Sequence, residues 1–208
     1  SLEFTPGERL TIEADVTPTV GVNQDVVGWS GWAKLGLNSS GKPNFRISPT
    51  DHPGKYVADD KHAAAASDTY HFAAVFDGKN VQIFVNGIDS GGRTTVLDEI
   101  GVSERGRYEN NFAIGASLKG TANDPVVSMF FVGVIDNLRV SKVARYSKDF
   151  TPPLRHSVDA DTLALYHFDE GSGDVLRDSS GNRHHGKIVG AKRVRVEDVD
   201  EPPSRYAL

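Results

Sequence analysis

The chain has 208 residues, a formal net charge of −5 and no cysteine, and these values exclude several classes of protein. A mildly acidic chain lacks the basic face that nucleic acid requires, and a chain without cysteine has neither a disulfide framework nor a thiolate metal site. The longest apolar run, Val126–Ile135, is shorter than the ~20 residues that span a bilayer. We therefore expect no nucleic-acid partner and no direct membrane insertion.

The length also bears on domain organisation. A chain of 208 residues suits one large β-sandwich better than two domains. The chain starts with Ser1 and without a signal-peptide pattern, so we expect a fragment of a longer protein.

Alternation of apolar and polar residues, the pattern of a half-buried β-strand, recurs along most of the chain. It is clear at residues 10–17, where Leu, Ile, Ala and Val alternate with Thr, Glu, Asp and Thr. No stretch has sustained helical periodicity, and residues 89–92 and 103–110 are expected to be loops. Further strands are predicted over residues 25–29, 32–37, 44–47, 70–76, 81–85, 111–116, 126–140, 163–168 and 188–196.

Two Asx-Gly dipeptides give the strongest local signal. Asp77-Gly78 separates the predicted strands Tyr70–Phe76 and Val81–Val85, and Asn86-Gly87 follows the second strand. Such pairs between alternating strands indicate β-hairpins, because they accept the positive φ that a tight turn requires. Odd- and even-numbered side chains of the second strand are expected on opposite faces.

Three segments resemble the laminin G-like domains of the concanavalin A-like lectin/glucanase superfamily. Residues 70–87 are similar to the central hairpin of these domains, with Tyr70 where the family usually has Trp. Residues 131–140, FVGVIDNLRV, are similar to the closing strand, and residues 163–173, LALYHFDEGSG, followed by DSSGN at 178–182, to the opening segment. The resemblance implies an all-β fold, a two-sheet antiparallel jelly-roll sandwich.

The opening segment stands last in this chain, which departs from the family's order. Either the domain is circularly permuted, or residues 163–191 begin a second, incomplete copy. We favour permutation, because few residues precede Leu10 and the resemblance implies that the first and last strands are neighbours. Residues 163–168 are then predicted to pair antiparallel with residues 132–140 and to complete their sheet. The predicted boundaries are a single domain at 1–196, including the completing segment 163–191, and an acidic, proline-containing tail at 197–208.

Two carboxylates on the first strand, Glu13 and Asp15, are the first candidates for chemistry. Glycosidases use a pair of carboxylates, one of them with a raised pKa, and related glucanases carry Glu-x-Asp-x-x-Glu on one strand. Here the last position of that pattern is Pro18. We interpret Glu13 and Asp15 as solvated acids on the polar face of the strand, and we expect no enzymatic activity.

Asp136 is a candidate metal ligand. It is in phase with the apolar residues of the segment 130–140, and a carboxylate on a buried face needs a cation or several hydrogen-bond donors. One interpretation is a calcium ligand, which the resemblance also suggests. The other is a salt bridge or backbone hydrogen bonds.

A glycine-rich acidic loop provides three more candidates, Asp169, Glu170 and Asp174. Oxygen ligands at this spacing suit Ca²⁺, although the loop lacks the EF-hand register. A turn with solvated acids is the alternative. Calcium is the cofactor that the sequence suggests.

Aromatic residues and histidines complete the candidates. Tyr56 and Tyr108, in predicted loops, are candidate ligand-binding residues because aromatic faces stack on sugar rings, whereas Trp29 and Trp32 are expected in the core. Adjacent histidines on a strand point to opposite faces, so the pair His184-His185 is expected on the surface. Packing within strands is expected for His71 and His167, and an Asx turn at residues 178–181.

These observations favour a non-catalytic binding module. We expect a lectin-like domain that recognises a carbohydrate or protein ligand, located extracellularly or in the cell envelope, as part of a larger bacterial protein. A monomer is expected. The alternatives are a purely structural or adhesion spacer domain and a degenerate glycoside hydrolase.

Overall fold

A computed structural model of the chain describes residues 9–29, 33–47, 55–58, 63–66, 68–95, 112–121, 124–196 and 205–207. This described part is all-β and contains no helix. It therefore holds no helix that could cross a membrane.

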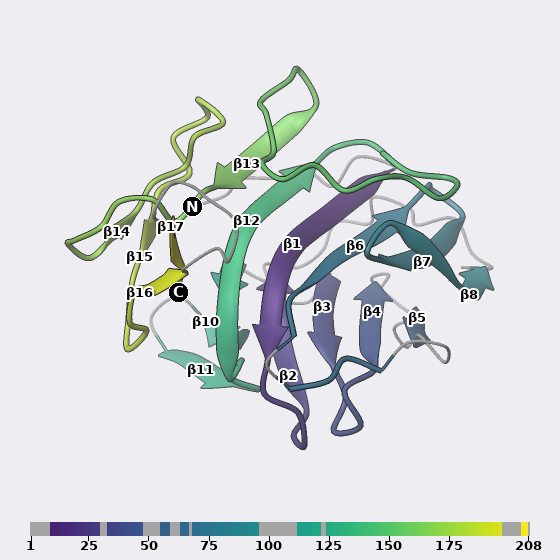
Figure 1. The fold of residues 1–208 in the computed structure, drawn as a ribbon, viewed down its shortest axis with the longest axis horizontal. Coiled ribbons are helices and arrows are strands. Elements are labelled where there is room, and N and C mark those ends of the chain that lie inside the picture. Colours follow the sequence, from purple (N-terminus) through teal and green to yellow (C-terminus); the bar gives the residue numbers. More distant parts are fainter. Residues whose placement is uncertain are drawn as a thin grey trace.

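The larger sheet has six strands and lies in front in Figure 1. All its neighbouring strands pair antiparallel. Its members are β1 (Leu10–Pro18), β6 (Tyr70–Phe76), β7 (Asn80–Val85), β8 (Ile88–Thr95), β12 (Gly133–Ser141) and β13 (Thr162–Tyr166). Their order across the sheet is β13-β12-β1-β6-β7-β8.

The second sheet has five antiparallel strands and lies behind the first (Figure 1). Its members, in spatial order, are β5 (Lys55–Ala58), β4 (Pro43–Ile47), β3 (Ala33–Leu37), β2 (Gln24–Trp29) and β9 (Phe112–Ile114). Three two-stranded antiparallel sheets complete the described strands: β10 (Ser117–Thr121) with β11 (Asp124–Ser128), β14 (Val175–Leu176) with β15 (Gly186–Lys187), and β16 (Val194–Val196) with β17 (Arg205–Ala207).

The main core fills the space between the two sheets, and period-2 alternation determines which side chains enter it. On β7, Val81, Ile83 and Val85 face this core, whereas Phe84 packs on the opposite, outer face of the sheet. The predicted alternation of this strand is confirmed. Trp29 is in the core as expected, and Trp32 lies outside the described residues.

The C-terminal strand β13 occupies the edge of the six-stranded sheet. It pairs antiparallel with β12, with Arg139 opposite Leu165 and Val140 opposite Ala164. Ala164, Tyr166 and Phe168 are buried in the main core. The predicted pairing of the closing and opening segments is confirmed.

A long connector covers the outer face of the six-stranded sheet. Residues 142–161, which we call the strap, leave β12, pass in front of β1 and return to β13 (Figure 1). Tyr146 and Phe150 of the strap pack on the apolar cluster that includes Phe84. Thr11 Oγ1 donates a hydrogen bond to the Val143 carbonyl oxygen at 2.7 Å. Because of the strap, β1 is buried on both faces.

The strap docks on the predicted Asn-Gly turn. Asn86 and Gly87 have φ values of 51° and 77°, as a tight hairpin turn requires. The Phe150 amide donates a hydrogen bond to the Gly87 carbonyl oxygen at 2.9 Å. A Cβ added to Gly87 would lie 1.9 Å from the Phe150 carbonyl oxygen, so this position requires glycine for both its φ and its space.

We expect Gly87→Ala to lower the free energy of unfolding by about 2–4 kcal/mol, from left-handed strain and displacement of the strap. Gly190→Ala is the matched control, because Gly190 has the same φ of 77° but nothing within 4 Å of an added Cβ. The control should lose about 1–2 kcal/mol. Chemical denaturation of both variants measures the difference, and equal losses would show that the strap does not press on this turn.

Several predicted boundaries are wrong. Residues 126–140 do not form one strand, because β11 ends at Ser128 and β12 begins at Gly133, with Met129 at a positive φ of 53° between them. Residues 89–92 belong to β8 instead of a loop, and the last predicted strand, 188–196, is reduced to β16. The strand β17 lies within the segment 197–208, whose assignment as a tail stays a prediction.

Candidate functional site

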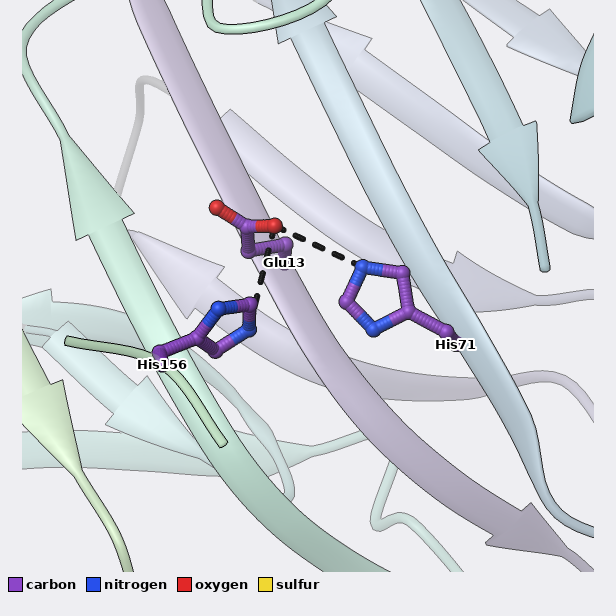
Figure 2. Close-up of side chains that lie close together, drawn as sticks. All are labelled: Glu13, His71 and His156. Atoms are coloured by element: carbon purple, nitrogen blue, oxygen red, sulfur yellow. Dashed lines mark ion pairs between the residues drawn. The ribbon is translucent and has the colours of Figure 1, made fainter. Parts of the chain in front are cut away.

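A group of buried polar side chains lies beneath the strap, on the outer face of the six-stranded sheet. We call it the buried cluster. β1 supplies Glu13, β6 supplies His71, β12 supplies Arg139, and the strap supplies Tyr146 and His156. Figure 2 shows both histidine rings beside the Glu13 carboxylate. Alternation directs these strand residues away from the main core, and the strap then closes over them.

Glu13 is at the centre of the buried cluster and is 0% exposed. Its Oε1 accepts a hydrogen bond from Arg139 Nε at 2.9 Å and lies 2.8 Å from Arg139 Nη2. Its Oε2 accepts a hydrogen bond from the Tyr146 hydroxyl at 2.8 Å. Burial raises the pKa of Glu13, but its interactions with His71 and Arg139 outweigh burial and lower the pKa to about 2. Glu13 is therefore a charged, fully enclosed carboxylate.

The two histidines differ in their surroundings. Burial lowers the pKa of His71, but Asp15 and Glu13 outweigh burial and raise it to about 9. His71 Nδ1 lies 2.9 Å from Asp15 Oδ1, and His71 Nε2 lies 3.4 Å from Glu13 Oε2. Burial is the main cause that lowers the pKa of His156 to about 4. His71 is the charged ring and His156 the neutral one.

The expectation that Glu13 and Asp15 are solvated is wrong for Glu13. Polar residues on alternate positions of a strand usually face water, but here the strap covers that face. Asp15 keeps a side-chain exposure of 20%, and its Oδ2 accepts a hydrogen bond from Asn137 Nδ2 at 3.1 Å. The buried packing expected for His71 is confirmed.

The buried cluster does not have the arrangement of a glycosidase. A glycosidase needs an acid with a raised pKa and access for the sugar between two carboxylates. The pKa of Glu13 is lowered, and the strap and Arg139 enclose its carboxylate. The cluster can order the strap or hold a small cation, but it offers no entry to a sugar ring.

An open depression of about 460 Å³ lies where the strap meets the segment after β13. Asp169, Glu170 and Asp174, three of the four predicted metal ligands, line it together, and Asp136 is not among its lining residues. The remaining lining residues are Arg155, His167, Ser172, Gly173, Val175, Arg177 and Ser179.

Two of these three carboxylates accept hydrogen bonds, one from a guanidinium and one from a backbone amide. Asp169 Oδ2 accepts a hydrogen bond from Arg155 Nη2 at 2.5 Å, and Glu170 Oε1 accepts one from the Arg177 amide at 2.6 Å. Asp174 is exposed. The depression thus presents guanidinium donors and carboxylate acceptors side by side.

Asp136 does not lie on the core face, because β12 contains a β-bulge. Between the pairs Glu13–Arg139 and Asp15–Asp136, β12 has one residue more than β1, and Asn137 has a positive φ of 49°. Such an insertion shifts the alternation by one position. Asp136 therefore lies opposite Asp15, and its Oδ1 accepts a hydrogen bond from the Asn137 amide at 2.7 Å. This contact is a backbone hydrogen bond, as one of the two interpretations expects, and calcium binding by Asp136 stays a prediction.

The other predicted residues have separate positions. Tyr56 is on β5, where its backbone pairs with Arg46, but its side chain and the whole of Tyr108 lie outside the described residues. His185 is exposed, and its Nδ1 accepts the Asp178 amide at 3.0 Å. The predicted Asx turn is confirmed, because Asp178 Oδ1 accepts a hydrogen bond from the Ser180 amide at 2.9 Å.

Arg139, Tyr146, Arg155 and His156 were not predicted. Arg139 lies in the closing-strand segment, where nothing in the sequence marks it as part of a site. The other three residues belong to a connector that has no periodic pattern. Glu13, His71 and Arg139 are ionisable residues within strands, but a solvated strand face carries such residues as well, so the sequence does not distinguish the buried cluster from a solvated face.

The fold defines the class: two antiparallel sheets packed face to face as a jelly-roll sandwich. The chain belongs to the concanavalin A-like lectin/glucanases superfamily, whose sequence profile matches residues 2–149. This range ends before the segment 163–191, so the circular permutation itself stays a prediction. A search of curated proteins found no match.

Solved structures agree with this fold. A suspected carbohydrate-binding protein from Bacteroides ovatus is similar with a TM-score of 0.63 and 17% identity, covering 87% of this chain and 54% of that one. The chain therefore spans about half the length of that protein. The CBM40 of the Ruminococcus gnavus IT-sialidase, bound to α2,3-sialyllactose, is similar with a TM-score of 0.53 and 17% identity, covering 67% of this chain and 78% of that one.

Proposed function

We propose that this chain is a non-catalytic carbohydrate-binding module that holds part of a glycan in the depression, as a domain of a larger protein outside the cell or in its envelope. The observation that carries the proposal is the mixed lining of the depression, where Arg155 and Arg177 stand beside Asp169 and Glu170. Sugar hydroxyls both donate and accept hydrogen bonds, so adjacent guanidinium and carboxylate groups suit them.

The size and openness of the depression support the same function. Its volume of about 460 Å³ is within the range of about 300–1,000 Å³ typical of small-molecule sites. The one buried carboxylate with a strongly lowered pKa on the covered sheet face, Glu13, is enclosed by the strap. These features favour binding at an open surface over hydrolysis.

The similar structures support the proposal at the level of the fold. One is a suspected carbohydrate-binding protein, and another is a CBM40 with a bound sialyllactose. Because a shared fold does not assign a function, the proposal depends on the depression itself.

A glycan array followed by calorimetry with a retained glycan tests this function. We expect Arg177→Ala to weaken binding of that glycan by about ten-fold or more, the effect of about one lost charged hydrogen bond. Arg46→Ala is the matched control, because Arg46 is an exposed arginine on β4 of the other sheet. Its affinity should equal that of the unmodified chain.

Two results would contradict the proposal. An array without any retained glycan would favour the adhesion or spacer alternative. A loss of affinity in Arg46→Ala but not in Arg177→Ala would move the site from the depression to the outer face of the five-stranded sheet.

Calcium is a separate proposal for the depression. Asp169, Glu170 and Asp174 offer the oxygen ligands that Ca²⁺ prefers, but Asp169 and Glu170 would have to exchange contacts with Arg155 and the Arg177 amide. Glycan affinity that falls in EDTA and returns with millimolar Ca²⁺ would support calcium. The same affinity in both solutions would overturn it.

A protein ligand is the second candidate, favoured by an exposed apolar patch. Val126, Met129, Phe130 and Val132 are 47–60% exposed around the turn between β11 and β12. Exposed apolar groups that gather in this way mark contact surfaces for other proteins. A cell-adhesion assay in which Phe130→Ser loses adhesion and Arg177→Ala retains it would favour this candidate.

A further inference from the structure

Three donor atoms in the buried cluster converge on one point. Glu13 Oε2 lies 3.4 Å from His71 Nε2 and 3.7 Å from His156 Nε2, and the three donor groups are all within 4.8 Å of one another. Figure 2 shows the two rings on either side of the carboxylate. Among the described residues, this is the group of histidines and acids whose donor atoms come close enough to share one ion.

Three of the four ring nitrogens in this group, all except His71 Nδ1, lack a hydrogen-bond partner. His156 is 2% exposed, and neither of its ring nitrogens has a hydrogen-bond partner, nor has His71 Nε2. A buried donor or acceptor without a partner costs about 1–3 kcal/mol, so such groups normally indicate a bound water or ion. Both ring nitrogens of His156 are therefore available to a ligand, and one of them, Nε2, lies 3.7 Å from the Glu13 carboxylate.

The spacing and the surroundings suit zinc. Two bonds of about 2.0–2.1 Å at a tetrahedral angle place donor atoms about 3.4 Å apart, close to the separations found here. The other nitrogen of His71 lies 2.9 Å from Asp15 Oδ1, the carboxylate contact that orients histidines bound to metals. Arg139 occupies Glu13 Oε1 and leaves Oε2 to the histidines and the Tyr146 hydroxyl.

We propose that Glu13, His71 and His156 bind one divalent transition-metal ion of the Zn²⁺ class beneath the strap. Imidazole and carboxylate ligands suit Zn²⁺, whereas Ca²⁺ takes oxygen ligands. An imidazole binds a metal in its neutral form, so His71 releases the proton on Nε2 to solvent when the ion binds. Because the ligands come from β1, β6 and the strap, the ion fastens the strap to the sheet. This site is distinct from the glycan-binding depression, and neither proposal depends on the other.

The test uses the whole chain after treatment with EDTA and its removal, with Zn²⁺ alone as the probe. Equilibrium dialysis should find one Zn²⁺ per chain, and the melting temperature should rise with the Zn²⁺ concentration. His156→Phe keeps a planar ring under the strap and removes both nitrogens, so its Zn²⁺ affinity should fall by at least ten-fold. His185→Ala, which removes an exposed histidine of the adjacent pair, should bind Zn²⁺ as the unmodified chain does.

Three results would overturn the site: no bound Zn²⁺, equal Zn²⁺ binding by His156→Phe, or loss of binding in His185→Ala alone. The first would show that the buried cluster is an ion-pair network without a metal. If His156→Phe does not fold, Co²⁺ bound to the unmodified chain decides. Intense visible absorption, typical of a four-coordinate site, supports the proposal, and the weak absorption of octahedral Co²⁺ contradicts it.

Discussion

Replacement of Glu13 with alanine is expected to lower the free energy of unfolding by about 3–5 kcal/mol, the cost of leaving a buried charge without its partner. Arg139 is 7% exposed and would lose its contacts to Glu13 Oε1 at 2.8 and 2.9 Å. Tyr146 would lose the acceptor of its hydroxyl. Urea denaturation in EDTA measures this loss without any contribution from a metal.

Asp159→Ala is the control for this prediction. Asp159 also pairs with an arginine, Arg145, at 2.7 Å, with side-chain exposures of 46% for Asp159 and 13% for Arg145. Because water reaches the Asp159 carboxylate, we expect this variant to lose only about 1–2 kcal/mol. The double variant Glu13→Leu, Arg139→Met should be more stable than Glu13→Leu alone, because it removes both charges. A Glu13→Ala variant that loses no more than Asp159→Ala would show that water reaches the buried cluster.

Deletion of residues 160–208 is expected to unfold or aggregate the protein. The deleted segment contains β13, and it places Tyr166, Phe168 and Leu176 in the main core, each at most 4% exposed. Each large apolar side chain contributes about 1.5–3 kcal/mol, and whole domains are stable by about 5–15 kcal/mol. The deletion also leaves the edge of β12 unpaired at an apolar face.

A shorter deletion provides the control. Removal of residues 197–208 deletes β17 but retains β13 and its core residues, so circular dichroism should show the same cooperative melting curve as the full chain. A chain without residues 160–208 that stays monomeric with an unchanged melting temperature would contradict the account of β13. It would instead favour a second, incomplete copy of the domain.

Much of the fold is predictable from local patterns. Alternation identifies β1 and β7, and the Asn86-Gly87 turn has the positive φ values that its sequence indicates. The pairing of β13 with β12 follows from the resemblance of the two segments. A break between strands is not predicted where no residue with a strong turn preference marks it. The break at Met129, between β11 and β12, is of this kind.

The residues of a candidate site are predictable when they are close in the sequence and not when tertiary folding brings them together. Asp169, Glu170 and Asp174 are close in sequence, so a single loop brings them to the depression. Glu13 and His156 come together because the strap folds back across the sheet, and no local pattern encodes that path. The same strap reverses the expected solvation of Glu13, and the bulge at Asn137 reverses the expected face of Asp136.

Chemical-shift mapping by NMR with a glycan retained on the array tests the central claim most directly. We predict that the shifts concentrate at the residues of the depression, Arg155, Arg177 and Ser179, that Glu13 and His71 are unaffected, and that the glycan is recovered intact. Shifts centred on Glu13 and His71 with cleavage of the glycan would contradict the account, because they would mean that the strap opens and the buried carboxylate acts on the sugar.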